Sequence, residues 1–174
     1  MFSKTTQIGI CGAGAMGAGI AQIAASAGHH VVVLDRDEAA LERGRNSVAK
    51  GAAALLKRGK ISAEDADNLQ SRITWTLDIN DLSRTGLVIE AIVENLEIKR
   101  VLFQKLENIV PKNTVLATNT SSLSVTQISV GLERPQKFIG LNFFNPAPIM
   151  KLVEVISGLN SDAKIVSSAL SLMQ

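Results

Sequence analysis

The pattern Gly12-x-Gly14-x-x-Gly17 constrains this chain most, because of the segments on either side of it. It directly follows residues 7–11, an apolar run that predicts a β-strand, and it opens the helical pattern of residues 16–27. In that context the first glycine permits a tight turn, the second lets the backbone approach a diphosphate, and the third lets helix and strand pack closely. The helix N-terminus also favours an anion. Taken alone, the pattern also fits a strand-to-helix turn without a ligand. The candidate binding loop is Gly12, Ala13, Gly14, Ala15, Met16 and Gly17.

Short apolar runs alternate with longer helical patterns along the rest of the chain. This alternation is typical of β-α-β units around a sheet whose strands are buried on both faces. We therefore predict an α/β fold of the Rossmann type, a doubly wound and mostly parallel sheet. The predicted strands are residues 7–11, 31–35, 72–75, 87–91, 115–118, 138–142 and 152–156. The predicted helices include residues 16–27, ending at Gly28, residues 96–110, ending at Pro111, and residues 161–174.

An insertion at residues 38–70 separates the second predicted strand from the third. It is Ala-rich and helical at first, breaks at Gly59, and restarts after Ser62, which can cap a second helix. We expect a helical hairpin that stands off the sheet. Because 174 residues are about a third short of two ordinary domains and no linker divides them, residues 1–174 are expected to form one domain.

Composition argues against several classes of partner. The net charge of +2 and the aromatic content of 3%, without any Tyr, favour neither nucleic-acid nor membrane binding. There is no signal-peptide pattern and no apolar run of membrane-spanning length, so a cytoplasmic protein is expected. The single cysteine, Cys11, supports no disulfide framework, and no metal site is predicted.

An acidic residue at the end of the second predicted strand gives the glycine loop its meaning. Asp35 follows Gly12 by 23 positions, where a carboxylate accepts hydrogen bonds from the adenosine ribose hydroxyls. A carboxylate there also repels a 2′-phosphate, which favours NAD over NADP. Arg36 is the opposing feature, because a guanidinium beside the ribose tolerates that phosphate.

Polar residues gather where three later strands end, and open α/β sheets collect their ligands at that edge. The segments are residues 90–95, 119–122 and 142–146. Each also has a plainer interpretation: residues 119–122 fit a turn with a helix cap, and Asn145-Pro146 fits a simple turn.

Glu154 interrupts an otherwise apolar strand. By alternation it shares a face with Leu152 and Ile156, so its carboxylate needs a partner. Either this is an edge strand with that face in water, or Glu154 is an acid that orients a catalytic group.

Four segments together resemble the 3-hydroxyacyl-CoA dehydrogenase family, in particular bacterial members that act on hydroxybutyryl-CoA or phenylacetate-derived thioesters. They are residues 12–19, 88–100, 119–123 and 140–156, spread over essentially the whole chain. The resemblance implies NAD-dependent oxidation of (3S)-3-hydroxyacyl-CoA to 3-oxoacyl-CoA in fatty-acid or aromatic-acid degradation. It also implies a C-terminal helical domain that forms homodimers, which we expect to be absent here.

The resemblance assigns roles to individual residues. Ser121 and Asn145 would hydrogen-bond the reacting oxygen, and Glu154 would hold a catalytic histidine. Glu94 and Lys99 match the family's contacts along the cofactor. Asn119 and Ser121 also belong to the expected cofactor site, and Ser121 to the substrate site as well.

The family's histidine falls at Asn142, in Gly140-Leu141-Asn142-Phe143-Phe144. An asparagine amide does not titrate near neutral pH, so it cannot take the substrate proton. The two histidines of the chain, His29 and His30, are expected to be ordinary loop residues far from the substrate. We therefore expect a chain that binds NAD but is impaired in oxidation, through either a deliberate or a natural change.

Basic residues end the first insertion helix at Lys57 and Arg58. They are either favourable charges at a helix C-terminus or, as in the resembling family, contacts to the CoA phosphates. Two other functions stay open: a non-catalytic NAD(H)-binding module that kept the fold and lost the base, and an enzyme for another hydroxy acid without CoA.

Overall fold

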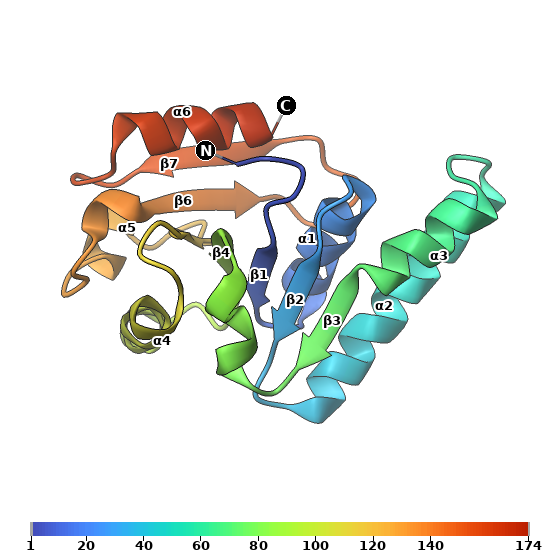
Figure 1. Cartoon of the computed structure of the whole chain (residues 1–174), viewed down its shortest axis with the longest axis horizontal. Helices are drawn as coiled ribbons and strands as arrows, with labels where there is room; N and C mark the ends of the chain where they lie inside the picture. The colour runs from blue at the N-terminus through green and yellow to red at the C-terminus, as the bar shows by residue number, and fades with distance from the viewer. Residues whose placement is uncertain (1, 174) are drawn as a thin grey trace.

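Six parallel strands and one antiparallel edge strand form a single sheet in the order β3-β2-β1-β4-β5-β6-β7. The computed structural model describes residues 2–173. The chain starts in the middle of the sheet, winds outward to β3, and returns to β4 on the other side of β1 (Figure 1). This is the predicted doubly wound order. The strands are β1 (Ile8–Cys11), β2 (Val31–Leu34), β3 (Ile73–Thr76), β4 (Leu87–Glu90), β5 (Val115–Thr118), β6 (Phe138–Phe143) and β7 (Val153–Ser157).

Helices cover both faces of the sheet. One hydrophobic cluster joins the sheet to α1, α2, α3 and α6, and a second joins its other face to α4, α5 and η1. Within the described chain, no helix is both long and apolar enough to cross a membrane. The helices are α1 (Ala15–Ser26), α2 (Glu38–Lys57), α3 (Ala63–Ser71), α4 (Leu96–Ile109), α5 (Val125–Ile128) and α6 (Ala163–Leu172), with 3₁₀ turns η1 (Ile79–Arg84) and η2 (Pro135–Lys137).

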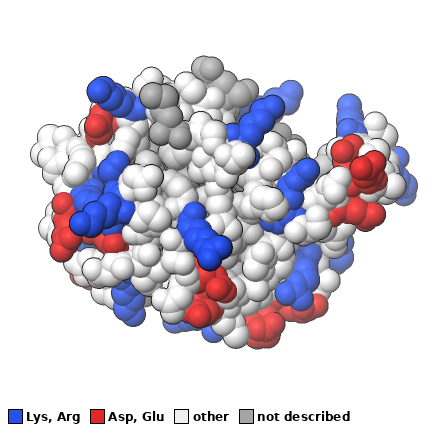
Figure 2. Space-filling view, viewed as in Figure 1, with Lys and Arg blue, Asp and Glu red and all other residues white. Residues whose placement is uncertain are grey.

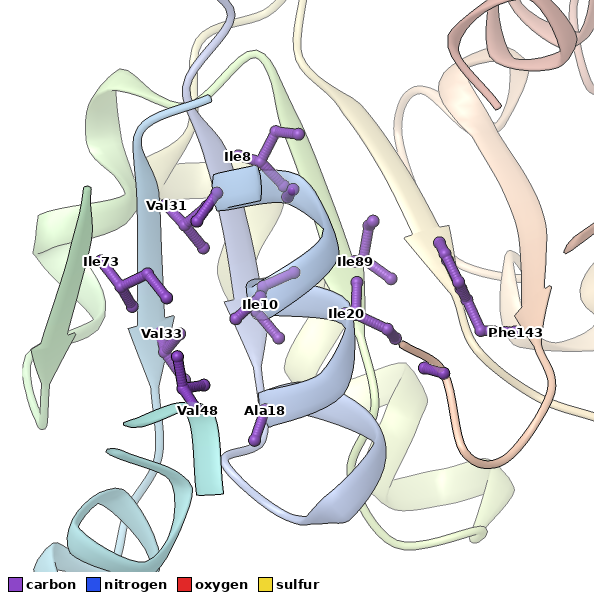
Figure 3. Close-up of a cluster of buried hydrophobic side chains, with 14 of the residues drawn as sticks. Ile8, Ile10, Ala18, Ile20, Val31, Val33, Val48, Ile73, Ile89 and Phe143 are labelled. Atoms are coloured by element: carbon purple, nitrogen blue, oxygen red, sulfur yellow. The ribbon is translucent and has the colours of Figure 1, made fainter. Parts of the chain in front are cut away.

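Alternate residues of the central strands supply the two clusters. Ile10, Val33 and Ile89 pack toward α1, as Figure 3 shows, whereas Val32 and Val88 face the α4 side. Burial of each such side chain contributes about 1.5–3 kcal/mol. The strands are therefore continuous apolar runs, which is why sequence alone located them.

The insertion forms the predicted helical hairpin, and its tip extends away from the sheet (Figure 1). The chain turns at Gly59 with φ +65°, a value that favours glycine. Ser62 and Asp65 form a capping box at the start of α3. The hydrogen bonds from Ser62 lower the pKa of Asp65 below its ordinary value.

The predicted strands and long helices are confirmed to within two residues at each end. The predicted last helix included Gln174, which lies outside the described residues; α6 ends at Leu172. The turns η1 and η2 and the helix α5 were not predicted, because three to six residues show no helical period. His29 lies in a loop as expected, yet it is buried, and its Nδ1 lies 2.9 Å from the Thr6 carbonyl oxygen.

Candidate active site

The three glycines of the loop face three different environments. Gly12 has φ +107°, and a β-carbon there would lie 2.6 Å from the Ala91 carbonyl oxygen. A β-carbon at Gly17 would lie 1.8 Å from the Gly12 carbonyl oxygen, so α1 can approach β1 only without a side chain at this position. A β-carbon at Gly14 would meet no heavy atom of the described residues within 4 Å, apart from its chain neighbours and the backbone of its own helix. The first and third glycines are thus required by packing, and the second leaves open space where a diphosphate would pass.

The N-terminus of α1 is suited to an anion. Gly14 is the N-cap, no side chain caps this end, and the first turn contains no acidic residue. The helix begins with the bond from Ala18 N–H to the Gly14 carbonyl oxygen. The preceding N–H groups and the positive end of the helix dipole therefore face the open space beside Gly14.

Asp35 lies immediately after β2, and its carboxylate is oriented by backbone donors. Ala13 N–H donates to Asp35 Oδ2 over 2.7 Å, and Asp37 N–H donates to Asp35 Oδ1 over 3.2 Å. A carboxylate offers about four acceptor positions, so it retains capacity for two ribose hydroxyls. The structure thus places this carboxylate directly beside the glycine loop, and its expected contact with the ribose stays a prediction.

A groove of about 560 Å³ runs from the glycine loop between β2 and α4. Asp35 and Arg36 line one side, and the exposed apolar side chains of Ile98 and Val101 line the other. An apolar slot beside an oriented carboxylate has the chemistry that an adenine ring and its ribose require. Burial raises the pKa of the Cys11 thiol in the floor of this groove far above its ordinary value, with the charges of Glu90 and Asp35 adding to the effect.

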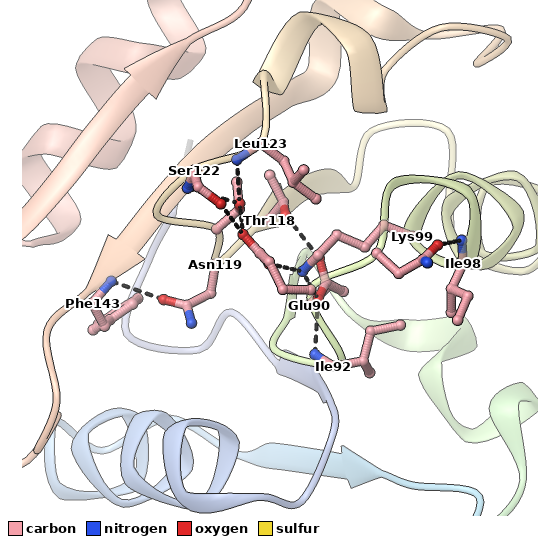
Figure 4. Close-up of polar contacts among 12 residues, drawn as sticks. Glu90, Ile92, Ile98, Lys99, Thr118, Asn119, Ser122, Leu123 and Phe143 are labelled. Carbon is pink, nitrogen blue, oxygen red and sulfur yellow. Dashed lines mark hydrogen bonds and ion pairs between the residues drawn. The ribbon is translucent and has the colours of Figure 1, made fainter.

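A buried ion-pair network lies on the β4 side of the loop (Figure 4). The side chain of Lys99 is fully buried, and its Nζ lies 2.5 Å from Glu90 Oε1 and 3.1 Å from Glu94 Oε2. Glu90 also accepts from the Thr118 hydroxyl over 2.7 Å. The Thr120 hydroxyl bonds Glu94 from the loop after β5. The expected cofactor contacts Glu94 and Lys99 thus lie together, but only Glu94 reaches the surface.

The loops that follow β5 and β6 meet at the carboxyl edge of the sheet. Phe143 N–H donates to Asn119 Oδ1 over 2.8 Å, which ties the end of β6 to the loop after β5 (Figure 4). Ser121 and Asn145 are exposed on these neighbouring loops. The predicted substrate-side residues therefore share one edge with the cofactor loop.

The segment after Asn145 lies against the cofactor helix. A β-carbon at Gly19 of α1 would lie 3.0 Å from Pro148 Cδ and 3.1 Å from Ala147 Cβ. This close approach depends on the absence of a side chain at position 19. The second half of the glycine-rich segment thus supports the substrate-side loop.

Asn142 and Glu154 face each other across β6 and β7. Asn142 Nδ2 donates to Glu154 Oε2 over 2.9 Å. The structure contains features of both interpretations of Glu154. As the first requires, β7 is an edge strand and Glu154 is exposed. As the second requires, the Glu154 carboxylate holds the side chain at position 142. A neutral amide paired with a carboxylate can hold a ligand oxygen but cannot accept its proton.

Glu90 and its partner Thr118 carry no role that was expected from the sequence. The available signal was a charged residue at the end of an apolar strand, because buried charges need partners. Among residues 2–173, no three His, Cys, Asp or Glu side chains come together as a metal site.

The doubly wound sheet, the glycine loop and the carboxylate after β2 together define a dinucleotide-binding domain. The chain belongs to the 3-hydroxyacyl-CoA dehydrogenase family, because the model of that family's NAD binding domain matches residues 7–174. Its cofactor is therefore NAD, as the sequence predicted.

Named relatives agree with this assignment. The chain is 43% identical over 166 residues to 3-hydroxyadipyl-CoA dehydrogenase of Escherichia coli strain K12, covering 95% of this chain and 35% of the relative. It is 43% identical to a probable 3-hydroxybutyryl-CoA dehydrogenase of Deinococcus radiodurans, covering 92% and 59%. A crystal structure of 3-hydroxybutyryl-CoA dehydrogenase from E. coli K12 superposes with a TM-score of 0.95 at 42% identity, covering 97% and 36%. The chain thus spans about a third to three-fifths of these relatives.

Proposed function

We propose that this chain is the NAD-binding part of a dehydrogenase for (3S)-3-hydroxyacyl-CoA thioesters, in fatty-acid or aromatic-acid degradation, whose catalytic step is impaired at Asn142. The cofactor half of the proposal rests on the loop geometry. Open space at Gly14, an uncapped helix N-terminus and an oriented Asp35 carboxylate match the diphosphate and ribose of NAD in turn.

The substrate half rests on the edge where the loops after β5 and β6 meet. Oxidation of a 3-hydroxyacyl thioester breaks the C3–H and O–H bonds; bound NAD supplies the hydride acceptor, and the hydroxyl proton needs a base. In this proposal Ser121 and Asn145 hydrogen-bond the reacting oxygen, and Asn119 holds their loops together through Phe143.

The single observation behind the proposed impairment is the hydrogen bond from Asn142 to Glu154. This pair has the arrangement of a base and its supporting acid, with an amide in the place of the base. Glu154 is exposed and accepts a hydrogen bond from the Asn142 amide. Its carboxylate is therefore poorly placed to act as the base instead of a histidine. Loss of a general base costs about 10²- to 10⁴-fold in rate.

The test is NADH consumption with acetoacetyl-CoA, measured for the unmodified protein and for Asn142→His. We expect both proteins to bind NADH, and the variant to turn over about 10²- to 10⁴-fold faster. Asn160→His, in an exposed turn after β7, is the matched control and should leave the rate unchanged. Equal rates for the unmodified protein and Asn142→His would contradict the proposed impairment.

The second candidate is a non-catalytic NAD(H)-binding module. The observation in its favour is that the Asn142 amide already has a stable partner in Glu154. The two functions differ in one measurement: a module binds NADH but shows no affinity for acetoacetyl-CoA by calorimetry, whereas an impaired dehydrogenase binds both.

The tip of the hairpin is the proposed contact for the CoA phosphates. Lys57 ends α2, and Arg58 is its C-cap, so both charges also complement the helix dipole. Figure 2 shows that the hairpin carries acidic as well as basic side chains on the face in view, so that face is not a continuous basic surface. The proposal therefore depends on these two residues rather than on overall charge.

A further inference from the structure

The ion-pair network of Glu90, Lys99 and Glu94 contains two acids and one base. The proposed function gives no role to the net negative charge that results. Glu90 and Lys99 have fully buried side chains, and that of Glu94 is 39% exposed. Burial of this kind is costly unless every charge is paired and hydrogen-bonded. Two acids share one lysine, so the pairing leaves one negative charge uncompensated.

Hydrogen bonding supports the ionised form of both acids. Within the described part of the chain, the hydrogen-bond partners of Glu90 all donate to it: Lys99 Nζ, Ile92 N–H at 2.8 Å and the Thr118 hydroxyl. Burial raises the pKa of Glu90 above its ordinary value, and the charge of Lys99 together with these donors limits the rise. For Glu94, burial also acts to raise the pKa, but hydrogen bonds from Thr120 and Lys99 outweigh it and hold the pKa below its ordinary value.

The network lies toward one particular half of the cofactor. The adenosine half is defined by Asp35 after β2, and the diphosphate passes the loop after β1. The nicotinamide half must then extend over the carboxyl ends of β4 and β5, on the other side of β1. Glu94 lies there: it follows β4 and bonds Thr120 and Ser122 in the loop after β5.

We propose that the network of Glu90, Lys99 and Glu94 makes this site discriminate between the two redox states of its cofactor, favouring NAD⁺ over NADH. The oxidised nicotinamide ring carries a positive charge that the reduced ring lacks, so one net negative charge beside it stabilises only the oxidised form. Glu90 is thus a specificity-determining residue that acts through Lys99. The inference rests on the NAD binding of the proposed function.

The size of the effect follows from Coulomb's law. For a separation on the order of 10 Å and an effective dielectric constant of about 20 to 40, removal of one charge changes the affinity ratio about fourfold to fifteenfold. A tenfold change corresponds to about 30 mV in the potential of the bound two-electron couple. Because the charges are mostly buried, added salt should screen the effect only weakly.

The experiment is calorimetric titration of the unmodified protein, Glu90→Gln and Glu94→Gln with NAD⁺ and with NADH. Glutamine keeps the shape of each side chain, and the amide at position 90 can donate to the Thr118 hydroxyl, which accepts as well as donates. Because the side chain of Glu94 is partly exposed, Glu94→Gln should fold. It provides the test if Glu90→Gln does not fold. The matched control is Glu97→Gln on the same helix, whose side chain is 73% exposed and paired with Arg100.

We expect both test variants to lose affinity for NAD⁺ relative to NADH by about fourfold to fifteenfold, and Glu97→Gln to keep the original ratio. A merely structural role would weaken both cofactors in parallel. Such a parallel loss, or an unchanged ratio in variants that still bind, overturns the inference alone. Failure of the unmodified protein to bind either cofactor contradicts the proposed function itself.

Discussion

Asn142 Nδ2 lies 2.9 Å from Glu154 Oε2, and the two residues are direct partners in the antiparallel pairing of β6 with β7. An imidazole introduced by Asn142→His would therefore face a carboxylate. Opposite charge favours the protonated ring, so its pKa should lie above the ordinary value of about 6.5.

In Asn142→His, oxidation of 3-hydroxybutyryl-CoA should consequently rise with pH through that raised pKa, because only the neutral ring accepts the substrate proton. Adding Glu154→Gln should move the midpoint down by about one pH unit. The pH profile of kcat/KM measures both midpoints. A midpoint that does not respond to Glu154→Gln would show that the carboxylate does not act on position 142.

Alanine substitutions at two glycines of the loop should have opposite consequences. Gly17→Ala forces a β-carbon to within 1.8 Å of the Gly12 carbonyl oxygen and should destabilise the fold by about 3 kcal/mol. Gly14→Ala meets nothing within 4 Å and should change stability by less than about 0.5 kcal/mol.

Gly14→Ala should nevertheless weaken NAD binding about tenfold or more, because the methyl group occupies the diphosphate path. Thermal unfolding and calorimetry separate the two effects. Normal NAD affinity in Gly14→Ala would place the diphosphate elsewhere.

The carboxylate of Asp35 should control the choice between NAD and NADP. Asp35→Asn removes charge-assisted hydrogen bonds to the ribose and the repulsion of a 2′-phosphate, so NADH affinity should fall about tenfold while NADPH gains relative to it. Fluorescence titration with each cofactor gives the ratio. Asp37→Asn, two residues later at the N-cap of α2, is the control, because Asn caps a helix as well as Asp does.

Charge reversal of Lys57 and Arg58 should weaken binding of a CoA ester about tenfold and leave NADH binding unchanged. Calorimetry with acetoacetyl-CoA measures the first effect. Lys50→Glu, exposed on the same helix, controls for charge alone. If the two residues serve only the helix end, their reversal should lower stability by about 0.3–1 kcal/mol each and leave both ligands unaffected.

The central strands of the sheet were predictable because they are buried on both faces, so that each is a continuous apolar run in the sequence. The glycine loop was predictable because it is a single strand-to-helix turn, and Asp35 because it follows the second strand of the same β-α-β unit. Lys99 shows where such reasoning stops: nothing local indicates that its nitrogen lies between Glu90 and Glu94. The bond from Thr118 to Glu90 joins residues 28 positions apart and depends on two strands becoming neighbours. The short elements η1 and α5 were missed because their conformation is set by packing, not by a repeating pattern.

The contact of Gly19 with Ala147 and Pro148 has a practical consequence for protein engineering. The residue at position 19 and the loop that rests on it form one transplantable unit, although 128 positions separate Gly19 from Ala147 in the chain. A relative chosen as the loop donor can carry a larger residue at position 19. A chimera that takes the loop from such a donor must also take the donor's residue 19. If residue 19 is exchanged alone, its side chain is forced against Ala147 and Pro148. The chimera then fails because the loop no longer packs on α1, before any substrate is tested.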